Sequence, residues 1–356
     1  MHVGAATIFQ NPGKFTSDYQ VYREELRLAD LAEPLGFQSI WGVEHHFTDY
    51  TMCPDVLQFL TYMAGRTTDM QLGSMVCVLP WHDPMRVAEQ VSMLDNLSDG
   101  RFILGVGRGL AKVEYDGFRV DMNESRTRFI ESAECLLAGL ESGFCEFDGE
   151  YIKQPRREIR PNPFRTFRGR TYAAAISPES SRIMAQLGVG MLVIPQKPWD
   201  EVQRDLSNYR AAWDESHTAG QNPPAPVVAC WTFCHEDADH ARDMARRYIG
   251  GYWHTVMEHY QFKADHHKDI KGYEYYGKVA EKMFDYGDDE VVDFFVNLQV
   301  WGTPEQCYDK ILQIRERTGH DTYVGAFSYA AMPYDEAEVS MRLFAAEVMP
   351  ELKAVG

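Results

Sequence analysis

Short, nearly continuous apolar runs recur along the 356-residue chain, with room for a helix between each pair. They are rich in β-branched and aromatic residues. A strand that is apolar at almost every position is typical of a parallel sheet covered on both faces. Eight runs follow this pattern, at residues 3–8, 39–43, 72–79, 102–106, 172–176, 192–194, 227–233 and 323–327. Each run predicts one strand.

Amphipathic stretches lie between these runs. Their apolar residues recur at the spacing of a helix that covers a core with one face. Three examples are Leu28, Leu31, Ala32 and Leu35; Ala133, Leu136, Leu137 and Leu140; and Val202, Leu206, Tyr209 and Trp213. Thr303-Pro304-Glu305-Gln306 predicts the start of another helix, because it combines a capping box with a proline in the first turn.

Strand and helix alternate eight times, which predicts an α/β fold, an eight-stranded parallel β/α (TIM) barrel in one domain of residues 1–356. A doubly wound open sheet is the alternative that the same alternation permits. Two segments break the rhythm. The small insertion at 144–170 begins with a hairpin whose turn contains Asp148-Gly149. A longer insertion at 248–300, before the last strand, is rich in aromatic residues and histidines, and we expect it to act as a lid.

Composition excludes several classes of function. The net charge of −18 argues against binding to nucleic acid or to an anionic membrane surface, because the chain has no basic surplus. The first residues show no secretory signal, and no apolar run approaches the roughly 18 residues that span a bilayer. The seven cysteines show no Cys-x-x-Cys spacing, and Cys230 and Cys234 are expected in the core. We therefore expect reduced thiols and a cytoplasmic protein.

The ends of the predicted strands carry the candidate chemistry. In a β/α barrel the catalytic groups gather at the carboxyl ends of the strands. Here "EHHF" at 44–47 follows the second strand, and "LPWH" at 79–82 ends the third. "GVGRGL" at 105–110 ends the fourth strand, and "ISPESS" at 176–181 ends the fifth.

The fourth and fifth strand ends suggest an anion site. Ser177, Ser180 and Ser181 surround a helix start at Pro178, where hydroxyls and free N–H groups meet at the positive end of a helix. The same serines also make an ordinary helix cap. Arg108 is the expected second contact, because flanking glycines let the backbone approach a ligand. The glycines of "GVGRGL" have the wrong spacing for a dinucleotide fingerprint, and no amphipathic helix opens directly behind them.

The histidine pair in "VEHHFTDY", at 43–50, allows three interpretations. His45 and His46 are possible metal ligands, but neighbouring side chains on an extended chain point to opposite sides, so the two would not easily share one ion. Either histidine is alternatively a hydrogen-bonded structural residue or an acid–base group. The residues alone leave these alternatives open.

Several blocks together resemble the bacterial luciferase-like flavin monooxygenases, and they span almost the whole chain in the family's order. They are "GFQSIWGVEHHFTDY" at 36–50, "VLPWHDPMRVAEQVSMLDNLSDGRFILGVGRGL" at 78–110, "DMNESR" at 121–126, "SPESSRIMAQLG" at 177–188 and "WGTPEQC" at 301–307. "EHHFTDY" and "DMNESR" are most similar to the luciferase α-subunit. Residues 248–300 have no clear counterpart in the family.

The resemblance implies that FMN binds at the carboxyl end of the barrel. Arg108, Ser177 and Ser180 would hold its phosphate, with the backbone around Leu110 beside them. Family members often carry a non-prolyl cis peptide on the third strand under the flavin ring, which would fall near Met75-Val76. No metal ion is expected in the site.

The resemblance also implies the reaction. Reduced FMN would react with O2 to give a flavin 4a-hydroperoxide, kept away from water, which oxygenates a small organic substrate such as an aldehyde or ketone. His45 would face the flavin and assist proton transfer, with Glu44 and His46 as supporting residues. Trp81 and His82 are expected to form part of the substrate pocket. A separate flavin reductase would supply the reduced FMN, since no dinucleotide fingerprint is present, and a homodimer is expected.

Three alternatives stay open at this point. Some relatives use a deazaflavin as a hydride carrier, which would make the protein a deazaflavin-dependent oxidoreductase. A minor branch of the family binds flavin without catalysis. A metal hydrolase on the same barrel would draw its ligands from His45, His46 and His82. The identity of the substrate is not readable from the sequence.

Overall fold

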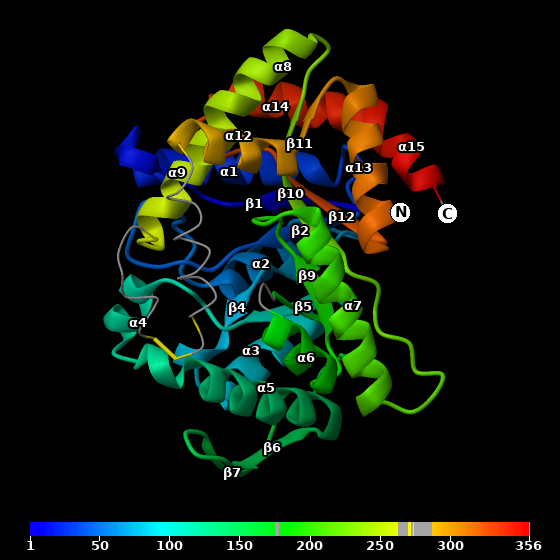
Figure 1. The fold of residues 1–356 in the computed structure, drawn as a ribbon. Helices are drawn as coiled ribbons and strands as arrows, with labels where there is room; N and C mark the ends of the chain where they lie inside the picture. The colour runs from blue at the N-terminus through cyan, green and yellow to red at the C-terminus, as the bar shows by residue number, and fades with distance from the viewer. Residues whose placement is uncertain (175–177, 263–269, 272, 274–286, 356) are drawn as a thin grey trace.

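Eight parallel strands close into a barrel in the computed structural model of the protein, which describes residues 1–174, 178–262, 270–271, 273 and 287–355 (Figure 1). In barrel order they are β1 (His2–Thr7), β2 (Ser39–Gly42), β3 (Gln71–Ser74), β5 (Phe102–Gly107), β8 (Thr171–Ala174), β9 (Gly190–Val193), β10 (Val227–Cys234) and β12 (Thr322–Ala326). β10 pairs with both β9 and β12, and β12 pairs with β1, so the ring is closed. The predicted TIM barrel is confirmed, and the open sheet is wrong.

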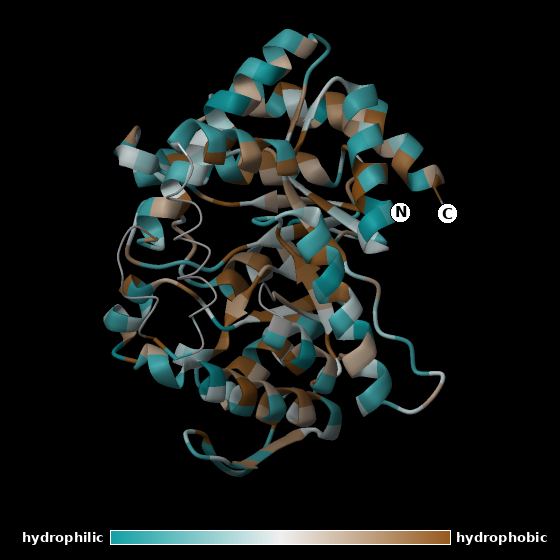
Figure 2. Cartoon of the chain, viewed as in Figure 1, coloured by the Kyte–Doolittle hydropathy of each residue, from teal (hydrophilic) through white to brown (hydrophobic). Residues whose placement is uncertain are grey.

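Helices form an outer layer around this ring. Those that cover the strands include α1 (Asp18–Ala32), α2 (Val56–Ala64), α3 (Pro84–Leu97), α5 (Ser125–Ser142), α6 (Pro178–Gln186), α7 (Trp199–Ser216), α13 (Pro304–Thr318) and α14 (Tyr334–Leu343). Figure 2 shows hydrophilic colour on the outward faces of these helices and hydrophobic colour on the strands. The stripe Val202, Leu206, Tyr209 and Trp213 is buried on α7, as its spacing predicts. Thr303 and Gln306 form the predicted capping box at the start of α13.

The third predicted strand shows the largest difference from the structure. The third run does not continue to residue 79. It stops as β3 at Ser74, resumes as the two-residue β4 (Cys77–Val78) and turns into a 3-10 helix at Leu79–Trp81. The predicted hairpin with its turn at Asp148-Gly149 is present. It joins β6 (Phe144–Asp148) to the antiparallel β7 (Lys153–Glu158). This hairpin lies at the far end of the molecule from α9 (Gly250–His259) (Figure 1).

The segment before the last strand is partly helical. α8 (Ala238–Met244) continues through a π-helical turn at Ala245–Ile249 into α9, and α12 (Asp288–Leu298) leads to the short strand β11 (Val300–Gly302) beside β10. Most of residues 263–286 lie outside the described residues, so the lid function stays a prediction. None of the described helices is long and apolar enough to cross a membrane. All seven cysteines are buried, with Cys230 and Cys234 inside β10 as expected.

Candidate active site

Two adjoining cavities open at the carboxyl ends of the barrel strands. We call the first the basic cleft, because Arg108, Arg126 and Ser180 lie in its lining. The second, the aromatic pocket, is lined among others by Tyr50, Trp231, Tyr252 and Tyr260. Five residues line both cavities: His45, Met75, Ile194, Gln196 and Tyr260. The predicted catalytic histidine therefore lies at the junction between the two cavities.

His45 is held in place by a buried carboxylate. It follows β2, and its Nδ1 lies 2.9 Å from Oε1 of Glu114, on the short helix α4 (Lys112–Phe118). The same oxygen accepts the backbone N–H of His46 at 2.8 Å, and Nε2 of His259 is 3.4 Å away. Burial opposes ionisation of Glu114, but the nearby imidazole rings of His45 and His259 outweigh it, so the pKa of Glu114 lies well below its ordinary value. Glu114 is thus an anion across the physiological pH range.

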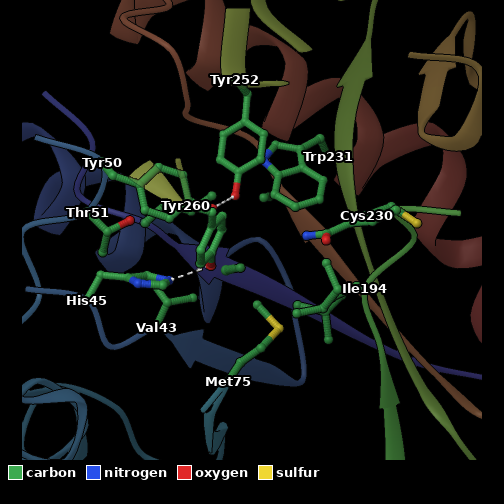
Figure 3. A pocket seen from close by; sticks show the side chains of 16 residues that line it. Val43, His45, Tyr50, Thr51, Met75, Ile194, Cys230, Trp231, Tyr252 and Tyr260 are labelled. Carbon is green, nitrogen blue, oxygen red and sulfur yellow. Dashed lines mark hydrogen bonds between the residues drawn. The ribbon is translucent and has the colours of Figure 1, made fainter. Parts of the chain in front are cut away.

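An anion at Nδ1 fixes which nitrogen of His45 carries a proton. Because ionised Glu114 only accepts hydrogen bonds, Nδ1 is the donor, and the neutral ring keeps its lone pair on Nε2. Nε2 faces the Tyr260 hydroxyl at 3.5 Å, and the side chain is 18% exposed. Figure 3 shows His45 and Tyr260 linked across the cavity. The arrangement presents a proton acceptor to whatever occupies the junction.

His46 belongs to a different cluster. Its Nε2 lies 3.1 Å from Oε1 of Glu44, and the same oxygen accepts from Nε1 of Trp81 at 2.9 Å and from Nε2 of His82 at 2.8 Å. The other oxygen of Glu44 accepts the backbone N–H of Val78 at 3.0 Å. Burial by itself would raise the pKa of Glu44. The hydrogen bonds from His46 and His82 outweigh burial and lower the pKa to about 2. Glu44 is therefore a buried anion that ties the ends of β2 and β4 together.

This cluster bears on one prediction. Among the described residues, neither Trp81 nor His82 lines the basic cleft or the aromatic pocket, and their place in the substrate pocket stays a prediction. Trp81 instead stacks on Phe118 at a ring distance of 5.4 Å, with its N–H on Glu44. Burial disfavours the charged form of His82, but its hydrogen bond to Glu44 prevails and raises its pKa. Trp81 and His82 therefore stabilise ionised Glu44, the carboxylate that also bonds to His46.

The basic cleft gathers cations at the fourth and fifth strand ends. Arg108 follows β5, and its guanidinium lies 4.0 Å above the ring of Tyr273, a fully buried residue of the 248–300 segment. Arg126, at the start of α5, forms a 2.5 Å ion pair with Glu179 of α6. Ser180 also lies in α6 and lines the cleft. Ser177 is outside the described residues.

Two glycines flank Arg108 in the lining of the basic cleft. A Cβ at Gly107 would lie 2.3 Å from Cγ2 of Val76, and one at Gly109 would lie 2.9 Å from Trp81 and Val78. Gly109 also has φ +78°, a conformation that other residues rarely adopt. The Met75-Val76 peptide bond is cis, as the resemblance implied, and Met75, Val76 and Leu110 all line the cleft. Glycine at both positions therefore lets the strand end that carries Arg108 pack closely against residues 76–81.

A model of the family described as luciferase-like monooxygenase matches residues 1–322. The chain belongs to this family. The alkanal monooxygenase alpha chain of Photorhabdus luminescens is 27% identical over 360 residues, covering 99% of this chain and 98% of the relative. The match confirms the resemblance drawn from the sequence blocks and makes the protein an oxidoreductase of the monooxygenase type.

Solved structures agree with the luciferase-like assignment. Monooxygenase RslO1 from Streptomyces bottropensis superposes with a TM-score of 0.82 at 26% identity, covering 99% of each chain. The oxygenating constituent of 3,6-diketocamphane monooxygenase from Pseudomonas putida, solved in complex with FMN, has a TM-score of 0.75 at 20% identity, covering 99% of this chain and 98% of that one. The coenzyme F420-dependent tetrahydromethanopterin reductase from Methanopyrus kandleri shares the fold, with a TM-score of 0.66 at 19% identity over 99% and 100% of the chains.

The three histidines that a metal hydrolase would need as ligands lie in two different clusters. His46 and His82 share Glu44, whereas His45 bonds to Glu114. Two other groups of described residues bring ligand-type atoms within 4.8 Å, namely Glu44, Cys77 and His82, and His45, Glu114 and His259. Burial raises the pKa of the Cys77 thiol well above its ordinary value, which disfavours the thiolate that binds metals. The set His45, His46 and His82 does not converge.

Several residues of the luciferase-like site escaped the sequence analysis. Glu114 lies one helical turn beyond "GVGRGL", and Arg126 ends the block "DMNESR", so both sat inside or beside segments already singled out. His259 and Tyr260 fall in the segment without a counterpart, and Tyr260 is 215 residues from His45. Nothing in the local pattern connects positions so distant, because only the closed barrel brings them together.

Proposed function

We propose that this luciferase-like protein is an FMN-dependent monooxygenase that transfers one atom of O2 to a small carbonyl compound such as an aldehyde or ketone. The observation that carries the proposal is the position of His45 at the junction of the basic cleft and the aromatic pocket, with Nδ1 on ionised Glu114. Reduced FMN would supply two electrons, so that one oxygen atom enters the substrate and the other leaves as water.

The residues of the basic cleft fit FMN. Arg108 and Arg126 provide the cations and Ser180 a hydroxyl at the first turn of α6, where backbone N–H groups favour an anion. Gly107 and Gly109, on either side of Arg108, let this strand end pack closely against Val76 and Val78, which also line the cleft. A relative of the same fold was solved in complex with FMN, which supports the same cofactor here.

The residues at the junction would manage protons and water. His45 would accept or return a proton at Nε2, and Glu114 would stabilise the charged ring when the proton arrives. Tyr260 stands over Nε2 and closes the junction on the side of α9. The apolar walls of the aromatic pocket exclude water, which protects reactive oxygen species from hydrolysis or release.

Product analysis tests the proposal directly. Purified protein, chemically reduced FMN, a carbonyl substrate and ¹⁸O2 should give a product that carries one ¹⁸O atom, and the H45A variant should give little. Absence of label from every product, with FMN bound, would refute it. Coenzyme F420 is the competing cofactor, because a reductase of the same fold depends on it. A deazaflavin enzyme would instead bind F420 more tightly than FMN and would reduce or oxidise its substrate without consuming O2.

The proposal includes the supply of electrons and the assembly. A separate flavin reductase would deliver reduced FMN, because "GVGRGL" lacks the spacing of a dinucleotide site. We also propose a cytoplasmic homodimer, and light scattering of the purified protein should give twice the 40.8 kDa chain mass. A monomer at micromolar concentration would contradict this part alone.

A further inference from the structure

Two imidazole rings meet one carboxylate beside the junction of the two cavities. Oε1 of Glu114 lies 2.9 Å from Nδ1 of His45 and 3.4 Å from Nε2 of His259. One ligand-type atom from each of the three residues lies within 4.8 Å of the other two. In a tetrahedral zinc site with bonds of about 2.0–2.2 Å, the ligand atoms are about 3.3–3.6 Å apart. The separation from His259 already has this value, and the separation from His45 needs only a small outward shift.

His259 directs an unused nitrogen at this carboxylate. The side chain is only 4% exposed, and its Nε2 has no hydrogen-bond partner in the part of the chain that the structure describes, because its approach to Glu114 is poorly aligned. The other ring nitrogen, Nδ1, lies 2.8 Å from Oγ1 of Thr48. When Nδ1–H donates to Thr48, the lone pair of the neutral ring is on Nε2 and faces the carboxylate. A bound cation satisfies both the lone pair and the carboxylate.

The ring of His259 is fixed from two directions. Thr48 holds Nδ1, and Tyr50 stacks on the ring at a distance of 4.5 Å with 14° between the planes. A hydrogen bond at the nitrogen that does not bind the metal is the usual way in which a ligating histidine is oriented. Figure 3 shows His45 next to Tyr50 and Thr51 at one side of the aromatic pocket. The ligand atoms are therefore organised before an ion arrives.

The types of ligand atom determine which ion fits. Imidazole nitrogen and carboxylate oxygen together suit Zn²⁺, Cu²⁺ and Ni²⁺, whereas Mg²⁺ and Ca²⁺ take oxygen ligands. An ion from solvent can reach the ligands, because His45 lines both cavities and Glu114 lines the basic cleft. Zinc is the informative probe, since it has no redox chemistry of its own.

We propose that His45, Glu114 and His259 form a zinc site, and that zinc inhibits the protein by occupying the histidine at the junction. The site itself rests on the geometry, and the inhibition rests on the proposed function. Zinc takes the place of the proton on Nδ1 of His45, and the neutral ring then carries that proton on Nε2. Nε2 no longer accepts a proton, so the ring loses its acid–base role. Release of zinc restores the hydrogen bond to Glu114.

Calorimetry of ZnCl2 with metal-free, FMN-free protein tests the site. The wild type should bind one zinc ion per chain, and H259A and E114Q should each weaken it by about tenfold or more. H254A is the matched control, because it removes an exposed histidine from the same helix, α9, and it should bind zinc as the wild type does. Mg²⁺ should not compete with zinc. Unchanged zinc affinity in H259A and E114Q, or an equal loss in H254A, would overturn the site.

T48V keeps the test decisive if H259A does not fold. It leaves all three ligands in place and removes only the hydrogen bond that orients His259, so zinc affinity should fall by about tenfold. Thermal melts without zinc establish that each variant is folded. A folded T48V that binds zinc as tightly as the wild type would contradict the assignment of His259 as a ligand.

The inhibition is tested in a single turnover with pre-reduced FMN, a carbonyl substrate and O2. Product yield should fall as zinc is added, with half of the effect at the Kd from calorimetry, and EDTA should restore it. Unchanged yield in the zinc-loaded protein would show that His45 is not blocked. If zinc binding follows the variants but no oxygenated product forms even without zinc, the proposed function fails while the zinc site stands.

Discussion

The side chains of His45 and His46 bond to two different buried glutamates, although the residues are neighbours in sequence. His45 reaches Glu114 through Nδ1 at 2.9 Å, and His46 reaches Glu44 through Nε2 at 3.1 Å. Successive side chains leave an extended backbone on opposite sides, which places one ring at the cavities and the other in the interior. His45 therefore faces the two cavities, and His46 secures the strand end.

This division predicts different effects for two chemically identical substitutions. H45A should lower single-turnover product yield with pre-reduced FMN by roughly 10²–10⁴-fold, the usual scale for a general acid or base, and should leave FMN affinity nearly unchanged. H46A should instead lower the free energy of unfolding by about 1 kcal/mol, because it removes one hydrogen bond. A thermal melt should then show a lower Tm. The assignment fails if H46A abolishes turnover while H45A behaves as wild type.

Glu114 should matter through its charge. E114Q keeps the shape of the side chain, but an amide can turn its N–H toward Nδ1 of His45 and no longer fixes the proton there. We expect the single-turnover rate to fall by roughly 10²-fold, with FMN binding retained. E114D keeps the anion and should recover part of the rate. Equal rates for E114Q and E114D, both folded, would show that the charge has no role.

The third prediction concerns the contact proposed between Arg108 and the phosphate of FMN. R108A should weaken FMN by about tenfold to hundredfold, the range of one charge-assisted hydrogen bond. Riboflavin lacks the phosphate, so its affinity should change much less. R126A is the matched variant on the same cleft, and its effect should follow the same ligand dependence. Equal losses for both ligands in a fluorescence titration would remove Arg108 from the phosphate site.

The source of electrons can be checked without a substrate. The chain should oxidise NADH slowly when purified, and addition of a flavin reductase with FMN should start oxygen consumption, because no dinucleotide fingerprint is present. Rapid NADH oxidation by the protein alone would contradict this expectation. An oxygen electrode and NADH absorbance measured in parallel separate the two outcomes.

The periodicity of apolar residues carried enough information for the barrel, because strand and helix each bury a distinct pattern. It also placed His45 and Arg108 at strand ends, where a barrel collects its functional groups. It did not reveal that Trp81 and His82 bond to Glu44, because the third strand stops at Ser74 and a 3-10 turn follows at residues 79–81. The direction of a side chain after a strand depends on local turns that apolar spacing does not encode.

Long-range partners were the other limit. Glu114 and Tyr260 meet His45 from 69 and 215 residues away. A hydrogen bond of this kind depends on the register of the closed ring and on the exit angle of α9, and both are properties of the folded barrel. Trp231 likewise reads as an ordinary apolar residue inside β10, and only the position of Tyr252 against it reveals an aromatic wall.

The last prediction concerns a buried carboxylate away from the basic cleft. Glu25 lies on the inner face of α1, is 3% exposed and accepts a 2.6 Å hydrogen bond from Ser328. Burial raises its pKa to about 7, which the hydrogen bonds from Ser328 and the backbone of Phe9 only partly oppose. The unfolded chain releases this proton near its ordinary pKa of 4.5. Between these values the folded protein holds a proton that the unfolded chain has lost.

Stability from this residue should therefore be complete below pH 4.5 and decline as pH rises to about 7. E25Q retains an acceptor for Ser328 but does not titrate, so its stability relative to wild type should increase between pH 5 and pH 8 by about 3 kcal/mol at most, since one pKa unit corresponds to about 1.4 kcal/mol. Urea unfolding at pH 5 and pH 8 measures this gap, which is the difference in unfolding free energy between the variant and wild type. The exposed Glu351 provides the control, and E351Q should keep a constant gap. If the E25Q gap is also constant, Glu25 is ionised in the folded protein at both pH values, and its burial does not set its protonation.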